Sequence, residues 1–255
     1  PWKWSWANAH ACPPMPERLD PTTIARFVDP LPIPAVLKPK GNSVNAASYQ
    51  ATMTEFQQQL LPAGFPATTV WGYEGSFPGP TIEAVEGDRV RILVTNKLPE
   101  HTSIHWHGIF LPNGMDGVGG LTQPHIKPGE TYVYEFTLRQ HGTFMYHPHA
   151  DEMLQLAVGM MGFFIIHPKN PERPRIDRDF AIMLHTWAIH PGTYRPDPAV
   201  MLDFNIFTFN SKVFPAIDHL VVKTGDRYHA NRIGGHGDRH CHGTPTYPEN
   251  SEAGQ

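Results

Sequence analysis

Two pairs of histidines are the residues of this sequence best suited to chemistry. His105 and His107 stand in "SIHWHGIF", and His147 and His149 stand in "FMYHPHAD". Residues i and i+2 of a β-strand point to one face, so each pair presents two imidazoles side by side. Four neutral imidazoles without a thiolate favour copper or zinc over magnesium or calcium. The pairs therefore predict a metal site, unless they only pack a half-exposed sheet, which is the alternative.

The cysteine content directs metal chemistry to imidazole. The chain has 16 histidines but only two cysteines, Cys12 and Cys241, which lie near opposite ends. Two such cysteines form neither a disulfide framework nor a zinc ribbon.

Charge and hydropathy exclude two classes of partner. The net charge is -4 without a long run of Lys or Arg, which gives no electrostatic basis for binding nucleic acid or an anionic membrane surface. No apolar run approaches the roughly 20 residues that span a bilayer. The chain opens with "PWKWSWANAH", without the basic start and apolar middle of a signal peptide, so we expect a soluble protein or a processed mature form.

Short strands divided by turns dominate the middle of the chain. Segments such as "RVRILVTN", "TYVYEFTL" and "MGFFIIHP" are rich in β-branched and aromatic residues and are bounded by Gly, Pro, Asn and Asp. This pattern predicts an all-β fold with a sandwich over residues 66–168. Residues 1–65 are rich in proline and are predicted to form an extended arm, in which "NAASYQATMTEFQQQLLP" could hold a short helical turn.

A second, shorter unit follows the linker "KNPERPRIDRD". Its "FTFNSKVFPAIDHLVVKTGDR" repeats the order of features in "WGYEGSFPGPTIEAVEGDR", with Phe-Pro and then Gly-Asp-Arg in both. We therefore predict a second domain of the same kind over residues 175–227. Residues 228–255 have almost no apolar residues and are predicted to be a polar, His-rich tail, so the second domain is expected to be incomplete.

Several spaced motifs resemble one family. "HWHG" at residues 105–108, "MDGVGGLTQPHIKPGETYVYEF" and "HGTFMYHPH" resemble the N-terminal cupredoxin domain of multicopper oxidases, the laccase-like enzymes. The resemblance is strong over residues 65–168 and moderate over residues 175–227. It implies a cupredoxin-like Greek-key β-sandwich, followed by an incomplete cupredoxin-like domain.

The resemblance also implies a role for each histidine. The family holds a trinuclear copper cluster with four His-rich motifs, two of them from the first domain. By this resemblance His105 binds the type 2 copper, His107 and His147 bind one type 3 copper, and His149 binds the other. The family usually has Ser where this chain has Pro148, so "HPH" is a variant that keeps both ligand positions.

Asp116, in "NGMDGVGG", matches a position at which the family has an acid near the cluster. The resemblance implies that its carboxylate relays protons to reduced oxygen. A carboxylate beside cupric ions would stay ionised and could hold a water or orient an imidazole. The alternative is a turn residue, because Asp-Gly suits a tight loop, and the sequence leaves both open.

The type 1 copper of the family has no complete counterpart. Such a site uses two histidines and one cysteine, often with a weak axial methionine. In "RHCHGTPTY", His240, Cys241 and His242 resemble the family's His-Cys-His core, but Thr246 stands where the family has a further histidine. A polar tail with a chance His-Cys-His is the favoured interpretation, and a shifted reading frame after Arg227 would produce it.

Two function hypotheses follow. The first is a copper-dependent oxidoreductase that oxidises phenolic, amine or metal-ion donors and reduces O2 to water, which makes O2 and such a donor its partners. The second is a truncated copper-binding fragment without turnover. An oligomer that completes the copper site between chains is a third arrangement, as in two-domain laccases, whereas a copper nitrite reductase fits "HWHG" with "HPH" less well. The family also implies a secreted or periplasmic protein.

Overall fold

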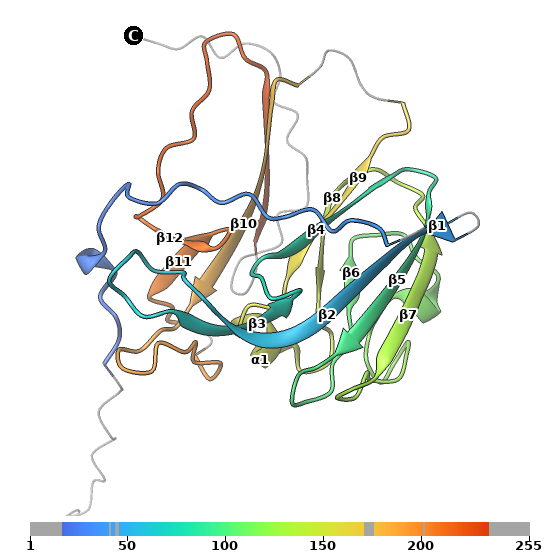
Figure 1. The fold of residues 1–255 in the computed structure, drawn as a ribbon, viewed down its shortest axis with the longest axis horizontal. Helices are drawn as coiled ribbons and strands as arrows, with labels where there is room; N and C mark the ends of the chain where they lie inside the picture. The colour runs from blue at the N-terminus through green and yellow to red at the C-terminus, as the bar shows by residue number, and fades with distance from the viewer. Residues whose placement is uncertain (1–16, 41, 44–45, 171–175, 201, 235–255) are drawn as a thin grey trace, which may run out of the picture.

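The computed structural model describes residues 17–40, 42–43, 46–170, 176–200 and 202–234. They form three β-sheets with very little helix, as Figure 1 shows. The prediction of an all-β fold is confirmed.

The first two sheets make a sandwich. The five-stranded sheet contains β1 (Asn42–Ser43), β2 (Ala46–Gln58), β5 (Arg89–Asn96) and β7 (Thr131–Thr137) in that order, with β3 (Thr68–Tyr73) paired to β2. The second sheet has the order β4 (Gly79–Val85), β9 (Gly162–His167), β8 (Gly142–His147) and β6 (His105–His107). Strands that are distant in sequence are therefore neighbours in both sheets.

The third sheet comes from the second half of the chain. Its order is β12 (Lys212–Phe214), β11 (Ile206–Phe209), β10 (Arg178–Trp187) and β13 (Tyr228–Gly234). The helical elements are short and are η1 (Pro21–Thr23), η2 (Asn113–Met115) and α1 (Glu152–Ala157). β13 begins where the sequence predicted a polar tail, and it pairs in parallel with β10 from Arg178 to Leu184.

The second sheet is covered on both faces, which explains the unbroken apolar run "MGFFIIHP". Phe164 belongs to the core between the first two sheets, together with Trp106 and Tyr146. The preceding residue, Phe163, faces the opposite side of this sheet and packs in a second core that also contains Trp187 of the third sheet. The β6–β8 pair, which carries the histidines, is thus backed by packed apolar residues.

The expectation of a helical turn in "NAASYQATMTEFQQQLLP" is wrong. Residues 46–58 form β2, which pairs with β3 on one side and β5 on the other. Tyr49, Ala51 and Met53 are buried while the residues between them are more exposed, and this period of two marks a strand with one face in the core. The alternation was present in the sequence, but the polar residues between the apolar ones obscured it.

The chain before β1 crosses from the third sheet to the sandwich, as the blue segment in Figure 1 shows. The amide of Leu19 donates to the carbonyl of Ile189, and the amide of Val28 donates to that of Ala216. Further along, the amide of Leu37 donates to the carbonyl of Thr81 in β4. This segment therefore links the two halves of the described chain through main-chain hydrogen bonds.

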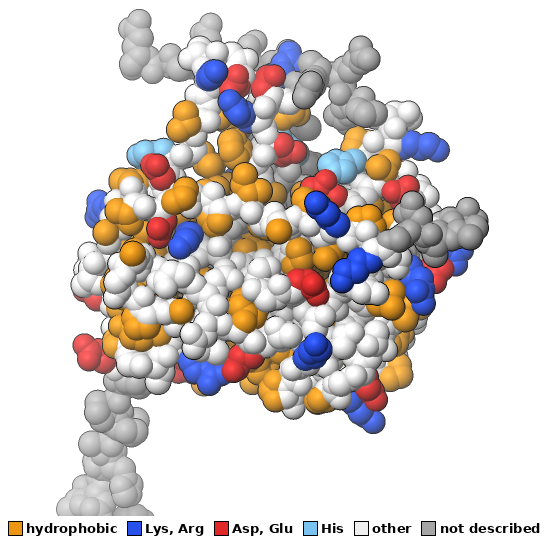
Figure 2. Space-filling view, in the orientation of Figure 1, with side chains coloured by type: hydrophobic (Ala, Val, Ile, Leu, Met, Phe, Trp, Pro, Cys, Tyr) orange, Lys and Arg blue, Asp and Glu red, His pale blue; other side chains and the backbone are white. Residues whose placement is uncertain are grey.

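Positive and negative side chains are interspersed over the face drawn in Figure 2. Among the described residues, no helix is long and apolar enough to cross a membrane.

Candidate metal centre

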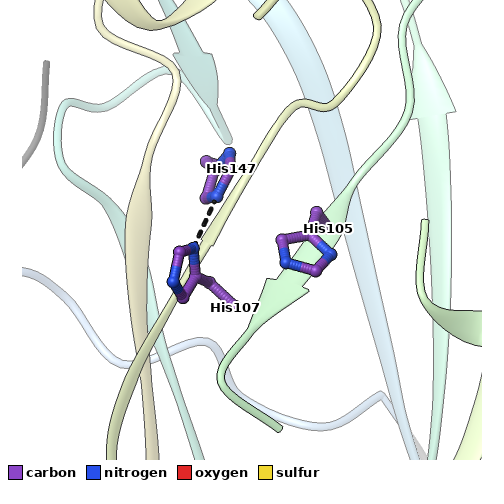
Figure 3. A group of neighbouring side chains, drawn as sticks. All are labelled: His105, His107 and His147. Atoms are coloured by element: carbon purple, nitrogen blue, oxygen red, sulfur yellow. Dashed lines mark hydrogen bonds between the residues drawn. The ribbon is translucent and has the colours of Figure 1, made fainter. Parts of the chain in front are cut away.

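Strands β6 and β8 bring three of the predicted histidines together. The two strands are antiparallel, with His105 opposite His147 and Trp106 opposite Tyr146. Because Trp106 and Tyr146 point into the sandwich core, the histidines on the alternate positions point to the other face. Figure 3 shows the imidazoles of His105, His107 and His147 gathered beside these strands.

The three imidazoles are close enough to bind one ion. One ring nitrogen from each of His105, His107 and His147 lies within 4.8 Å of the others. The shortest separation is 3.1 Å, between Nδ1 of His107 and Nε2 of His147. Two nitrogens bound to one ion at about 2.0–2.1 Å in tetrahedral geometry lie roughly 3.3 Å apart. The His107–His147 spacing therefore fits two ligands of the same ion.

His149 lies beside this group rather than within it. Its ring centroid is 5.4 Å from that of His105 and 6.3 Å from that of His147. β8 ends at His147, and Pro148 has no N–H with which to extend the strand. The second pair therefore does not share one strand face as the spacing suggested, although all four histidines are neighbours.

Main-chain carbonyls orient two of the rings. Nδ1 of His105 donates to the carbonyl oxygen of Asp116 at 2.7 Å, and Nδ1 of His147 donates to that of Pro148 at 2.8 Å. A carbonyl can only accept, so the proton of each neutral ring is on Nδ1 and the lone pair is on Nε2. Metal-binding histidines are commonly fixed in this way by a second hydrogen bond.

Burial keeps His147 neutral. It is 3% exposed, and its pKa is lowered from 6.5 to about 3, chiefly because burial disfavours the charged ring. The hydrogen bond to Pro148 raises this pKa, whereas the neighbouring rings of His105, His107 and His149 lower it. A neutral imidazole can bind metal without first losing a proton, so His147 is ready to act as a ligand at neutral pH.

Asp116 lies at the end of η2, against His105. Its carboxylate oxygen Oδ1 is 3.5 Å from Nδ1 of His105, in addition to the hydrogen bond made by its carbonyl. Gly117 follows with φ +86°, so the tight Asp-Gly turn is present as well. The sequence pointed to the carboxylate, whereas the closer contact is through the main chain, which no side-chain pattern reveals.

The sequence analysis missed Glu152, the first residue of α1. Its two carboxylate oxygens lie 3.8 Å from Nδ1 of His147 and 3.8 Å from Nε2 of His149. The sequence signal for Glu152 was its position three residues after His149. That spacing indicates a contact only if a helix begins at Glu152, as α1 does.

A comparison with known protein families matches the part of the chain that contains these histidines. Residues 56–171 match the family model described as multicopper oxidase. This stretch belongs to the multicopper oxidase family. The resemblance seen in the sequence is confirmed, and the sandwich is the family's cupredoxin-like domain.

Named multicopper oxidases and related proteins match with substantial identity. Copper resistance protein A of Escherichia coli is 42% identical over 149 residues, which are 56% of this chain and 24% of that protein. Dihydrogeodin oxidase of Aspergillus terreus is 45% identical over 124 residues, which are 47% of this chain and 20% of that protein.

Among solved structures, the multicopper oxidase from Campylobacter jejuni superposes with a TM-score of 0.72 at 26% identity, covering 87% of this chain and 47% of that one. The chain thus spans about a quarter of the length of the curated relatives it matches.

The family implies copper, and the residues present fit it. The cluster offers imidazole nitrogens without a thiolate, which suits copper, and two of these nitrogens already have the spacing of ligands to one ion. The residues expected for a type 1 copper, His240, Cys241 and His242, and the departure at Thr246 lie outside the described residues.

Proposed function

We propose that this chain supplies half of the oxygen-reducing copper centre of a multicopper oxidase. The observation that carries the proposal is the 3.1 Å contact between Nδ1 of His107 and Nε2 of His147, across paired strands. In the metal-free chain one proton lies between these nitrogens, and an ion bound by both would take its place. In the proposed enzyme, copper supplies the redox chemistry by which O2 is reduced to water while a donor is oxidised.

The individual roles are proposals that follow the family. His105 is assigned to the type 2 copper, His107 and His147 to one type 3 copper, and His149 to the other. The hydrogen bond from His105 to the Asp116 carbonyl supports its assignment, because it leaves Nε2 as the ligand atom. The separate position of His149 supports a ligand to a different ion.

Asp116 is proposed to hold a proton or a water for the reaction. Its side chain is 36% exposed, so its carboxylate is open to solvent while Oδ1 remains 3.5 Å from the His105 ring. A carboxylate in this position can accept a proton from water and pass it toward the centre.

The proposal extends to the organisation of the whole chain. We divide the chain into an arm (1–65), a first cupredoxin domain (66–168), a partial second one (175–227) and a tail (228–255). Two strands cross these bounds, because β2 of the arm pairs with β5 of the first domain and β13 at the start of the tail pairs with β10 of the second. The electron donor is proposed to be a phenol, an amine or a metal ion, and the protein to be secreted or periplasmic. The other half of the copper centre would come from further domains or from another chain in an oligomer.

The second candidate is a copper-binding fragment without turnover. Within the part of the chain that the structure describes, one group of three or more potential ligands has metal-binding spacing, and it comes from the first sandwich alone.

Copper loading followed by oxygen uptake separates the two candidates. The chain is loaded with copper, and O2 consumption is measured with a phenolic donor. We expect copper to bind, and four one-electron oxidations of the donor for each O2 consumed would support the oxidase. Copper binding without oxygen uptake would instead support the fragment, and failure to bind copper would contradict both.

A further inference from the structure

We propose that Glu152 is a positioning residue that holds the imidazole of His149 in the orientation in which it binds metal, while its other carboxylate oxygen lies against His147. This role rests on the proposed metal centre. It requires that the Glu152 carboxylate lie against the ring of His149, that its backbone be fixed, and that no other group already orient that ring.

The first condition is met by the two carboxylate oxygens. Oε1 lies 3.8 Å from Nδ1 of His147, and Oε2 lies 3.8 Å from Nε2 of His149. At this distance the oxygens are within ion-pair range of the rings rather than hydrogen-bonded to them. One carboxylate thus spans both members of the second histidine pair.

The second condition is met by the anchoring of α1. Gln155, three residues after Glu152, is fully buried and donates from Nε2 to Oε1 of Glu100 at 2.7 Å and to the carbonyl of His101 at 2.9 Å. Its Oε1 accepts from the hydroxyl of Thr102 at 2.6 Å. The helix is therefore tied to the segment that leads into β6, which fixes Glu152 relative to both strands that carry histidines.

The third condition, that no other group already orients the ring, is met by His149 but not by His105 or His147. His105 and His147 are already oriented by the carbonyls of Asp116 and Pro148. For His149, the polar group that the structure places against a ring nitrogen is Glu152. We therefore expect His149 to depend on Glu152 more strongly than His147 does. Outer groups of this kind orient metal-binding histidines and typically change metal affinity by about 10- to 100-fold when lost.

The neighbouring residue provides a matched control. Asp151 is exposed and makes no side-chain hydrogen bond to the helix that it precedes. Asp151→Asn and Glu152→Gln each remove one negative charge from adjacent positions. Any difference between them reports the contact with the rings rather than the net charge.

Two measurements test the role. Nitrogen-detected NMR of the metal-free chain reports the tautomer of each imidazole, and competition with a chelator reports copper affinity. Glu152→Gln is expected to change the tautomer populations of His149 and to weaken copper binding by about 10- to 100-fold, while Asp151→Asn changes neither.

The outcomes distinguish this role from the proposed function. If Glu152→Gln matches Asp151→Asn in both measurements, the positioning role is wrong, whatever the chain does with copper. If the His149 tautomers change but the unaltered chain binds no copper, the positioning role stands and the proposed function fails. Thermal unfolding of both variants confirms that the comparison is made on folded protein.

Discussion

Replacing His147 with alanine is expected to weaken copper binding at least about 100-fold, beyond the range expected for loss of an outer group. The ring is buried, neutral and 3.1 Å from its partner nitrogen on His107, so the variant removes a ready ligand from the middle of the cluster. His105→Ala is expected to lower copper content as well, because it removes the third nitrogen of the group. Metal analysis and chelator competition measure both effects.

His141→Ala is the matched control for these variants. His141 immediately precedes β8, the strand that His147 ends, and its exposed ring contacts Glu86. His141→Ala also removes one imidazole, but from the residue just before β8, at the end of the strand opposite to His147. Copper binding should therefore not change. Unchanged copper content in both His105→Ala and His147→Ala would show that the site assignment is wrong.

The sequence could predict the histidine pairs but not their register. A period of two places His105 and His107 on one face of a strand wherever that strand lies. That His105 faces His147 depends on β6 and β8 being neighbours, and strand pairing is decided by how the apolar faces of the whole sandwich pack. The family resemblance supplied what local pattern could not.

The groups that orient the rings were harder to predict. The Asp116 contact to His105 runs through a carbonyl, which every residue has, so residue type carries no signal for it. Glu152 reaches the centre because α1 starts directly after the second histidine pair and is held there by Gln155. Both depend on tertiary placement of short, irregular segments, for which periodicity gives no information.

The missed strand β2 has a different cause. Its buried residues Tyr49, Ala51 and Met53 alternate correctly, but the intervening polar residues and the absence of strong turn residues made a helical turn seem compatible. Pairing with β5, rather than intrinsic preference, decides the outcome.

Gly117 connects the turn after η2 to the metal centre, and its replacement by alanine is expected to have a large effect. Its φ of +86° is strained for any residue with a side chain, and an added Cβ would overlap the carbonyl of Ile104 and lie 2.9 Å from Cα of His105. The turn could then not remain against β6. We expect a loss of about 3 kcal/mol or more in the free energy of unfolding, measured by urea denaturation.

The same variant should also weaken copper binding, because the displaced turn takes the Asp116 carbonyl away from Nδ1 of His105. Gly114→Ala in η2, just before this turn, is the control. An added Cβ there meets nothing within 4 Å, so we expect a change in the free energy of unfolding within about 0.5 kcal/mol. If the two variants were equally stable and bound copper equally well, the turn would not be packed on β6 as the structure has it. A difference confined to Gly117→Ala would show that the packing of this turn on β6 maintains the orientation of His105.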